Sequence, residues 1–118
     1  MIRLVAPTTP LARVREIAAS GGGFLYVISR EGVTGEQAHL ATGLAAQAAA
    51  IRGVTSLPLA IGFGISDPAQ ARAAAAHADA VVVGSAIVKR VGEYGAAPDL
   101  AARVAEFVRP LVAAVKSV

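Results

Sequence analysis

Short aliphatic runs alternate along this chain with longer segments in which apolar residues recur every three or four positions. Continuous runs of Val, Leu and Ile are typical of parallel strands that are covered on both faces. The longer segments have the period of amphipathic helices. We expect strands at residues 2–6, 24–29, 57–64 and 80–83, each followed by a helix.

The segments between the expected strands contain helix start and stop signals. Thr9 can cap a helix whose first position is Pro10, and the glycines at 21–23 end it. Asp67 and Gln70 are spaced as in a capping box, with a proline between them at the first helical position. The expected helices run from Pro10 to the glycines, from about Glu36 to Arg52, from Pro68 to about Ala78, briefly from Ser85, and from Pro98 toward the C-terminus.

The resulting order is βαβαβαβα, and such alternation predicts a parallel sheet with right-handed crossovers. We treat residues 1–118 as a single domain, since this length suits one hydrophobic core. The core should be aliphatic, because 55% of the residues are hydrophobic and only 4% are aromatic.

Composition excludes several functions. The chain has no cysteine, which rules out disulfides, thiolate metal sites and a cysteine nucleophile. The net charge of +3 is scattered among acids, without the basic and aromatic stretch typical of nucleic-acid binding. No apolar segment is long enough to span a bilayer, and the first ten residues do not resemble a signal peptide. We therefore expect a cytoplasmic protein with no metal, nucleic-acid or membrane partner.

Glycines gather where the expected strands end. Gly32 and Gly35 follow the second strand, Gly62 and Gly64 the third, and Gly84-Ser85 the fourth. Ligands of parallel α/β folds bind at the carboxyl ends of the strands, and the N-terminus of a helix favours an anion. The pattern predicts an anion site formed by three loops. Glycines that merely relieve crowding at strand ends are the alternative interpretation.

Four ordered motifs, "LVAPTTP", "YVISREGVTG", "LPLAIGFGISDPAQ" and "ADAVVVGSAIVKRV", resemble the C-terminal half of the tryptophan synthase alpha subunit family. The resemblance covers essentially the whole chain. It implies a TIM barrel whose fifth to eighth strands are the four strands expected here. Members of that family split indole-3-glycerol phosphate into indole and glyceraldehyde 3-phosphate, without a cofactor.

The resemblance also implies roles for individual residues. The phosphate-binding positions of the family match Gly35, Gly64, Gly84 and Ser85. Phe63 would lie beside the substrate, Tyr26 would line the pocket, and Thr34 would belong to the loop that closes over the substrate. These assignments follow from the matching motifs alone.

The acid–base residues of the family lie on and after its second strand, which this chain does not contain. Glu31 and Glu36 flank the loop expected to close, Asp67 is assigned to capping, and Asp79 to a turn. The remaining acids and both histidines fall on helix or linker positions. We therefore assign no catalytic residue.

Half a barrel leaves two open sheet edges and an apolar inner face. Two copies pairing edge to edge would close an eight-stranded barrel. The alternative is a flavodoxin-like, doubly wound open sheet. Two functions follow: a half-barrel that binds a phosphate or sugar phosphate without catalysing a reaction alone, or one part of a split lyase that needs a complementary N-terminal half.

Overall fold

A computed structural model describes residues 1–28, 37–62 and 64–118 of the chain. Four parallel strands form one sheet in the order β1-β2-β3-β4. They are β1 (Arg3–Val5), β2 (Leu25–Ile28), β3 (Leu59–Gly62) and β4 (Ala80–Val82). The helices are α1 (Leu11–Ala19), α2 (Gln37–Arg52), α3 (Pro68–Ala75), α4 (Ser85–Tyr94) and α5 (Leu100–Lys116).

The sequential strand order decides between the two predicted architectures. A flavodoxin-like sheet reverses direction after its first strand, so that the first strand lies inside the sheet. Here each strand pairs with the next one along the chain, and β1 and β4 are the two ends of the sheet. The half-barrel prediction is therefore confirmed, and the flavodoxin-like alternative is wrong.

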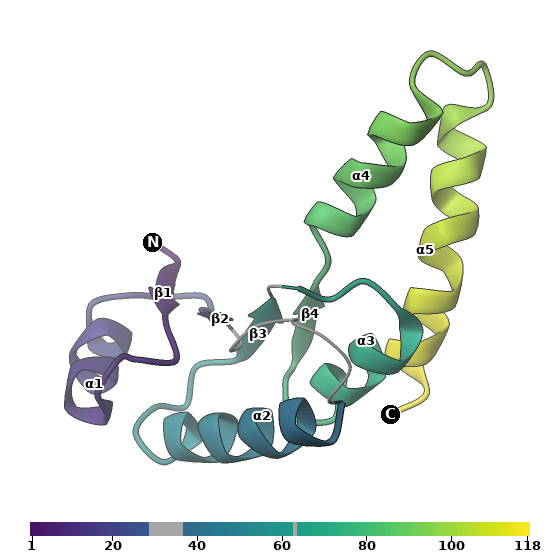
Figure 1. Cartoon of the computed structure of the whole chain (residues 1–118). Helices are drawn as coiled ribbons and strands as arrows, with labels where there is room; N and C mark the ends of the chain where they lie inside the picture. The colour runs from purple at the N-terminus through teal and green to yellow at the C-terminus, as the bar shows by residue number, and fades with distance from the viewer. Residues whose placement is uncertain (29–36, 63) are drawn as a thin grey trace.

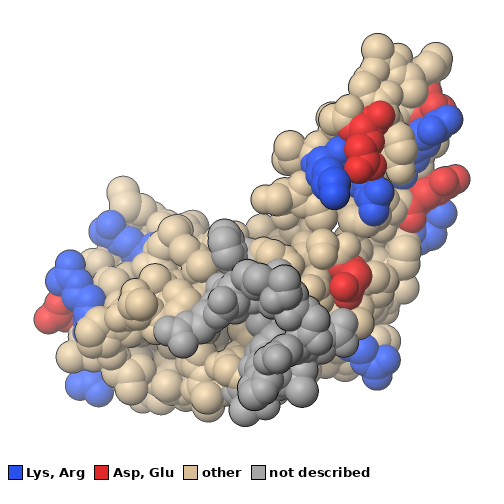
Figure 2. Space-filling model, viewed as in Figure 1, with Lys and Arg blue, Asp and Glu red and all other residues tan. Residues whose placement is uncertain are grey.

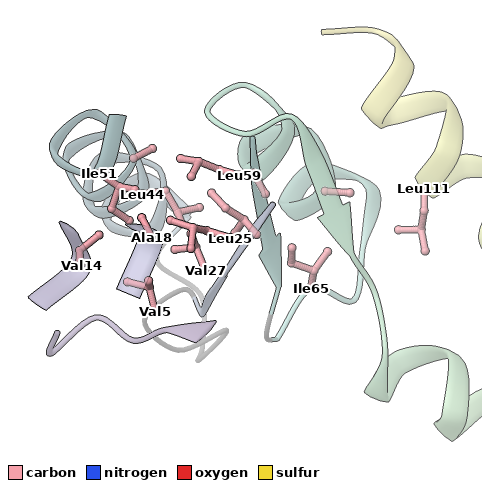
Figure 3. Close-up of a cluster of buried hydrophobic side chains, with 14 residues drawn as sticks. Val5, Val14, Ala18, Leu25, Val27, Leu44, Ile51, Leu59, Ile65 and Leu111 are labelled. Carbon is pink, nitrogen blue, oxygen red and sulfur yellow. The ribbon is translucent and has the colours of Figure 1, made fainter. Parts of the chain in front are cut away.

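The helices cover one face of the sheet. Right-handed crossovers between successive neighbouring strands place every connecting helix on the same side. Figure 1 shows α1, α2 and α3 fanning around the outside of the curved row of strands. Side chains that point to this outer face are buried, among them Val5, Val27 and Ile61 at no more than 1% exposure. In Figure 3 Val5 and Val27 lie close to Val14 of α1 and to Leu44 of α2, and all belong to one core cluster.

Two helix boundaries differ from the sequence prediction. The first helix begins at Leu11, with Pro10 rather than Thr9 in the capping position. Thr9 instead uses its Oγ1 to accept a hydrogen bond from the Ala6 backbone N–H at 3.0 Å, which stabilises the turn after β1. The third helix ends at Ala75, before the expected Ala78. Ala78 lies in the connection to β4, where it packs against the core.

The C-terminal helices form a hairpin that extends beyond the sheet (Figure 1). Helix α5 packs against α3 and α4. Tyr94 is the last residue of α4, and the Arg103 guanidinium lies 5.4 Å from the centre of its ring. Helix α4 has no buried residue. Among the described helices, none combines the length and apolar character needed to cross a membrane.

Candidate functional site

The carboxyl ends of three strands lie at the same level of the sheet. Ile28 at the end of β2 pairs with Gly62 at the end of β3, and Gly62 pairs in turn with Val82 at the end of β4. Loops that leave these ends therefore start side by side. The sheet thus positions the segments that the glycine pattern singled out.

Tyr26 lies on the inner face of the sheet, opposite to the helices. Its ring rests against Gly62, where a Cβ would collide with the Tyr26 hydroxyl and also meet Val82. A glycine at position 62 therefore makes room for the tyrosine. The structure places Tyr26 on the inner face of the sheet, two residues before the end of β2.

The loop after β3 is held by a short network. Asp67 caps α3 by accepting a hydrogen bond from the Gln70 N–H at 2.8 Å, as predicted. The Gln70 Oε1 accepts from the Ser66 N–H at 2.8 Å, one residue earlier than a capping box requires. Ile65 is buried, and Gly64 adopts a φ of +74°, a conformation that favours glycine. Gly64 is thus fixed next to the end of β3.

Gly84 and Ser85 form the start of α4. Gly84 is in the capping position, and its carbonyl accepts hydrogen bonds from the N–H groups of Ile87 and Val88. Both Gly84 and Ser85 are exposed, and the position of a Cβ at Gly84 is open space. Within the described chain no side chain caps this helix. Its first N–H groups point away from the helix and are free to receive a ligand.

The structure assigns Asp79 to the opposite end of the sheet. Its Oδ2 accepts from the Leu59 N–H at 2.9 Å and from the Arg52 guanidinium at 3.0 Å. Because Leu59 begins β3 and Asp79 precedes β4, this carboxylate lies at the amino ends of the strands. The Leu59 hydrogen bond, followed by the contacts with Arg52, lowers the pKa of Asp79 below its ordinary value. Asp79 therefore has a structural role, because it links the end of α2 to the start of β3.

Three other described acids form ion pairs on the surface. Arg13 pairs with Glu16, Arg90 with Glu93, and Arg103 with Asp99. In Figure 2 charged side chains gather on the α4–α5 hairpin and at the end of the molecule that carries α1. Among residues 1–28, 37–62 and 64–118, no group of three His, Asp or Glu could hold a metal ion.

The predicted site residues are thus only partly described. The structure brings Tyr26 and Gly62 into contact and places Gly64, Gly84 and Ser85 after neighbouring strands. Thr34, Gly35 and Phe63 lie outside the described residues, as do Glu31 and Glu36. Their expected roles remain predictions.

One feature escaped the sequence prediction. An open apolar groove of about 330 Å³ runs between β4 and the two C-terminal helices. We call it the β4 groove, and it is lined by Val81, Val83, Ile87, Val108, Leu111, Val112, Val115 and Lys116. In the sequence of α5, Val108 and Val112 widen the apolar stripe that is formed by Leu100, Val104, Phe107, Leu111 and Val115. That extra width is the signal that could have revealed the groove.

Comparisons with known proteins agree with this architecture. A sequence profile described as "Tryptophan synthase alpha chain" matches residues 1–116. The chain is 49% identical over 112 residues to the tryptophan synthase alpha chain of Halorhodospira halophila. The aligned region covers 94% of this chain and 41% of that relative. Its identity to the homologue of Opitutus terrae is 46% over 116 residues, covering 98% and 44% of the two chains.

Solved structures give the same result. The tryptophan synthase subunit alpha from Legionella pneumophila superposes with a TM-score of 0.78 at 30% identity, covering 99% of this chain and 42% of that one. Tryptophan synthase from M. tuberculosis gives a TM-score of 0.77 at 28% identity, covering 98% and 40%. The chain therefore spans less than half the length of these relatives. It belongs to the tryptophan synthase alpha chain family of tryptophan biosynthesis, of which it represents the C-terminal part.

Proposed function

We propose that this half-barrel binds a phosphate or sugar phosphate at the carboxyl ends of its strands and does not catalyse a reaction alone. The observation that carries the proposal is the alignment of three strand ends, with Gly64 and Gly84-Ser85 following two of them. By the resemblance of its motif, Gly35 would belong to a third loop that follows β2.

The start of α4 supplies the attraction for an anion. Its free N–H groups and the helix dipole both favour negative charge. The exposed Ser85 hydroxyl adds a donor at the same place. Open space at Gly84 lets phosphate oxygens approach the backbone closely.

Most of the described acids already form structural hydrogen bonds or ion pairs, which supports the absence of independent catalysis. Asp67 caps α3, and Asp79 joins α2, β3 and β4 at the far end of the sheet. Three further acids are paired with arginines on the surface. General acid–base groups contribute about 10²–10⁴-fold to catalysis, so a site without them should be inert in practice.

An NMR titration with glycerol phosphate tests the binding site. The wild type should show shifts at Gly64, Gly84 and Ser85. Gly84→Asp should abolish them, because it introduces a carboxylate beside the anion. Ser85→Ala should weaken binding by a few-fold to about tenfold, corresponding to one hydrogen bond of about 0.5–1.5 kcal/mol.

Gly92→Asp is the matched control for the change in charge. Gly92 also lies in α4 with open space around it, about two turns from the start of the helix. This variant should bind as the wild type does. Equal shifts in all four proteins, or shifts confined to other regions, would contradict the proposed site.

The second candidate function is one part of a split lyase of tryptophan biosynthesis. It is favoured by the coverage of only 41% and 44% of the length of two relatives named alpha chains. The chain alone should release no indole from indole-3-glycerol phosphate. Mixing it with a separately produced N-terminal half of a relative should restore release. Indole formation by the purified chain alone would refute both the dependence on a partner and the assigned lack of catalysis.

A further inference from the structure

The side chain of Gln70 reaches out of its own helix into the loop after β3. Side chains of an α-helix lean toward its N-terminus, so a long side chain in the first turn of α3 can reach residues that precede the helix. The Gln70 Oε1 accepts hydrogen bonds from the Ser66 N–H at 2.8 Å and from the Ser66 Oγ at 3.1 Å. A backbone N–H can only donate, so this contact also determines which way the amide group of Gln70 is turned.

These hydrogen bonds are placed differently from those of a capping box. In a capping box the side chain at the third helical position accepts from the N–H of the capping residue, which here is Asp67. Gln70 instead bonds Ser66, which lies outside the helix. The Asp67 Oδ1 accepts from the Gln70 N–H at 2.8 Å and caps α3 without the Gln70 side chain. The side chain of Gln70 therefore holds the loop rather than the helix.

Both sides of this contact are attached to the hydrophobic core. Ala71 and Ala74 of α3 are fully buried, which fixes the helix that carries Gln70. In the loop Ile65 is buried and belongs to the same core cluster. The loop is thus held at Ile65 by packing and at Ser66 by Gln70. All of these residues lie in the interior of the chain, between the end of β3 and α3.

Gly64 comes immediately before these two points of attachment. Its φ of +74° lies in the region that favours glycine, and glycine has the greatest backbone freedom when nothing constrains it. Gly64 is exposed, so burial does not fix it. If the loop were loose, an anion would have to order it before binding. The apparent affinity then falls in proportion to the fraction of molecules whose loop is already in the binding conformation.

We propose that Gln70 is a positioning residue for the anion site: it holds Ser66 and thereby keeps Gly64 in the conformation that receives a phosphate oxygen. This role rests on the proposed function, and it is indirect, because the Gln70 oxygen that bonds Ser66 cannot donate to an anion. The helices that follow β3 and β4 then differ in their use. The start of α4 is open to the anion, whereas the first turn of α3 is occupied by Asp67 and serves to hold the loop.

Gln70→Ala tests the proposal, with glycerol phosphate as the probe in an NMR titration. Alanine favours the helix and removes both hydrogen bonds to Ser66. Binding should weaken by about three- to tenfold, as expected if the binding-competent fraction of the loop falls to about 0.1–0.3. At saturation the shifts at Gly84 and Ser85 should persist, whereas the shift at Gly64 should become smaller. A loss of stability alone would leave this pattern of shifts unchanged.

Hydrogen exchange without ligand measures the loop directly. The protection factor of the Ser66 N–H should be lower in Gln70→Ala than in the wild type. Gln70→Glu keeps an acceptor oxygen at the same reach and should restore the protection. Arg72→Ala is the matched control, because it also shortens a long side chain to alanine in α3 and Arg72 is exposed. Arg72→Ala should leave the protection of Ser66 and the pattern of shifts as in the wild type.

The outcomes separate the role of Gln70 from the site itself. Unchanged affinity in Gln70→Ala, with an unchanged shift at Gly64, would overturn the positioning role and leave the proposed site intact. Equal weakening in Gln70→Ala and Arg72→Ala would also overturn it. A wild type that shows no shifts with glycerol phosphate would refute the proposed site, and the role of Gln70 with it. Circular dichroism verifies folding, and if Gln70→Ala is unfolded, Gln70→Asn, which is one methylene shorter, decides.

Discussion

The two faces of this sheet are built from alternate residues of the same strands, yet their side chains differ in solvent exposure. On the outer face Leu25 is fully buried beneath the helices of its own chain. On the inner face Leu4, on the neighbouring strand, is 58% exposed. Both are leucines in parallel strands, so residue type does not explain the contrast. The difference lies in what covers them: the crossovers supply helices for one face only.

The contrast separates a packed layer from an open one. The outer layer is a core in which α1, α2 and α3 pack against the strands. The inner face contains aliphatic and aromatic side chains, among them Leu4 and Tyr26, that are exposed or half-buried. The packing that stabilises the described chain therefore lies mainly on the outer face.

Replacing one leucine on each face should produce the largest difference. Leu25→Ala is expected to lower the free energy of unfolding by about 2–5 kcal/mol, because it leaves a cavity in a packed core. Leu4→Ala should change it by at most about 0.5 kcal/mol. Urea denaturation of the wild type and of both variants measures the two changes. Equal losses for the two variants would show that the inner face is packed within one chain.

Asp79 tests the helix-covered side in a second way, with a smaller effect. Asp79→Ala removes the acceptor of a part-buried hydrogen bond from the Leu59 N–H and should cost about 0.5–1.5 kcal/mol. Asp99→Ala is the matched control, since Asp99 forms an exposed pair with Arg103 four residues away. Exposed pairs of this kind contribute little to stability, so Asp99→Ala should unfold almost as the wild type does. An equal loss of unfolding free energy in Asp99→Ala and Asp79→Ala would show that the Asp79 hydrogen bond contributes no more than an exposed ion pair.

The Asp79 effect should also depend on pH. Its pKa is lowered in the folded state, so its stabilisation is present above the ordinary value of 3.8 and is lost as the pH falls through the lowered pKa. The difference in unfolding free energy between wild type and Asp79→Ala should therefore shrink below pH 3.8. Chemical denaturation at a series of acidic pH values measures it.

Local signals were sufficient for the elements, and the order of the strands required more. Pro68 and Asp67 fixed the start of α3 because capping depends on adjacent residues. The alternation of strands and helices was compatible with two sheet orders, since it does not state which strands are neighbours. The resemblance of four motifs to one family favoured the correct order.

Tertiary contacts account for what the sequence did not predict. Thr9 bonds the end of β1 instead of capping α1, because the turn brings the Ala6 N–H within reach of its hydroxyl. The β4 groove depends on how α5 lies against α3 and α4, which the period of one helix does not determine. The sequence groups Gly62 with the glycines at the strand ends. It does not reveal that Gly62 makes room for the ring of Tyr26 on the adjacent strand.

The sequential strand order also bears on how this protein folds. Each strand finds its neighbour after one helical crossover, so strand pairing within the chain needs no contact between its two ends. Folding rates fall as contacting residues become more distant in sequence. A barrel made from one continuous chain must finish by joining its first strand to its last. In the described sheet every pairing joins consecutive strands, so none of these pairings requires such a closure.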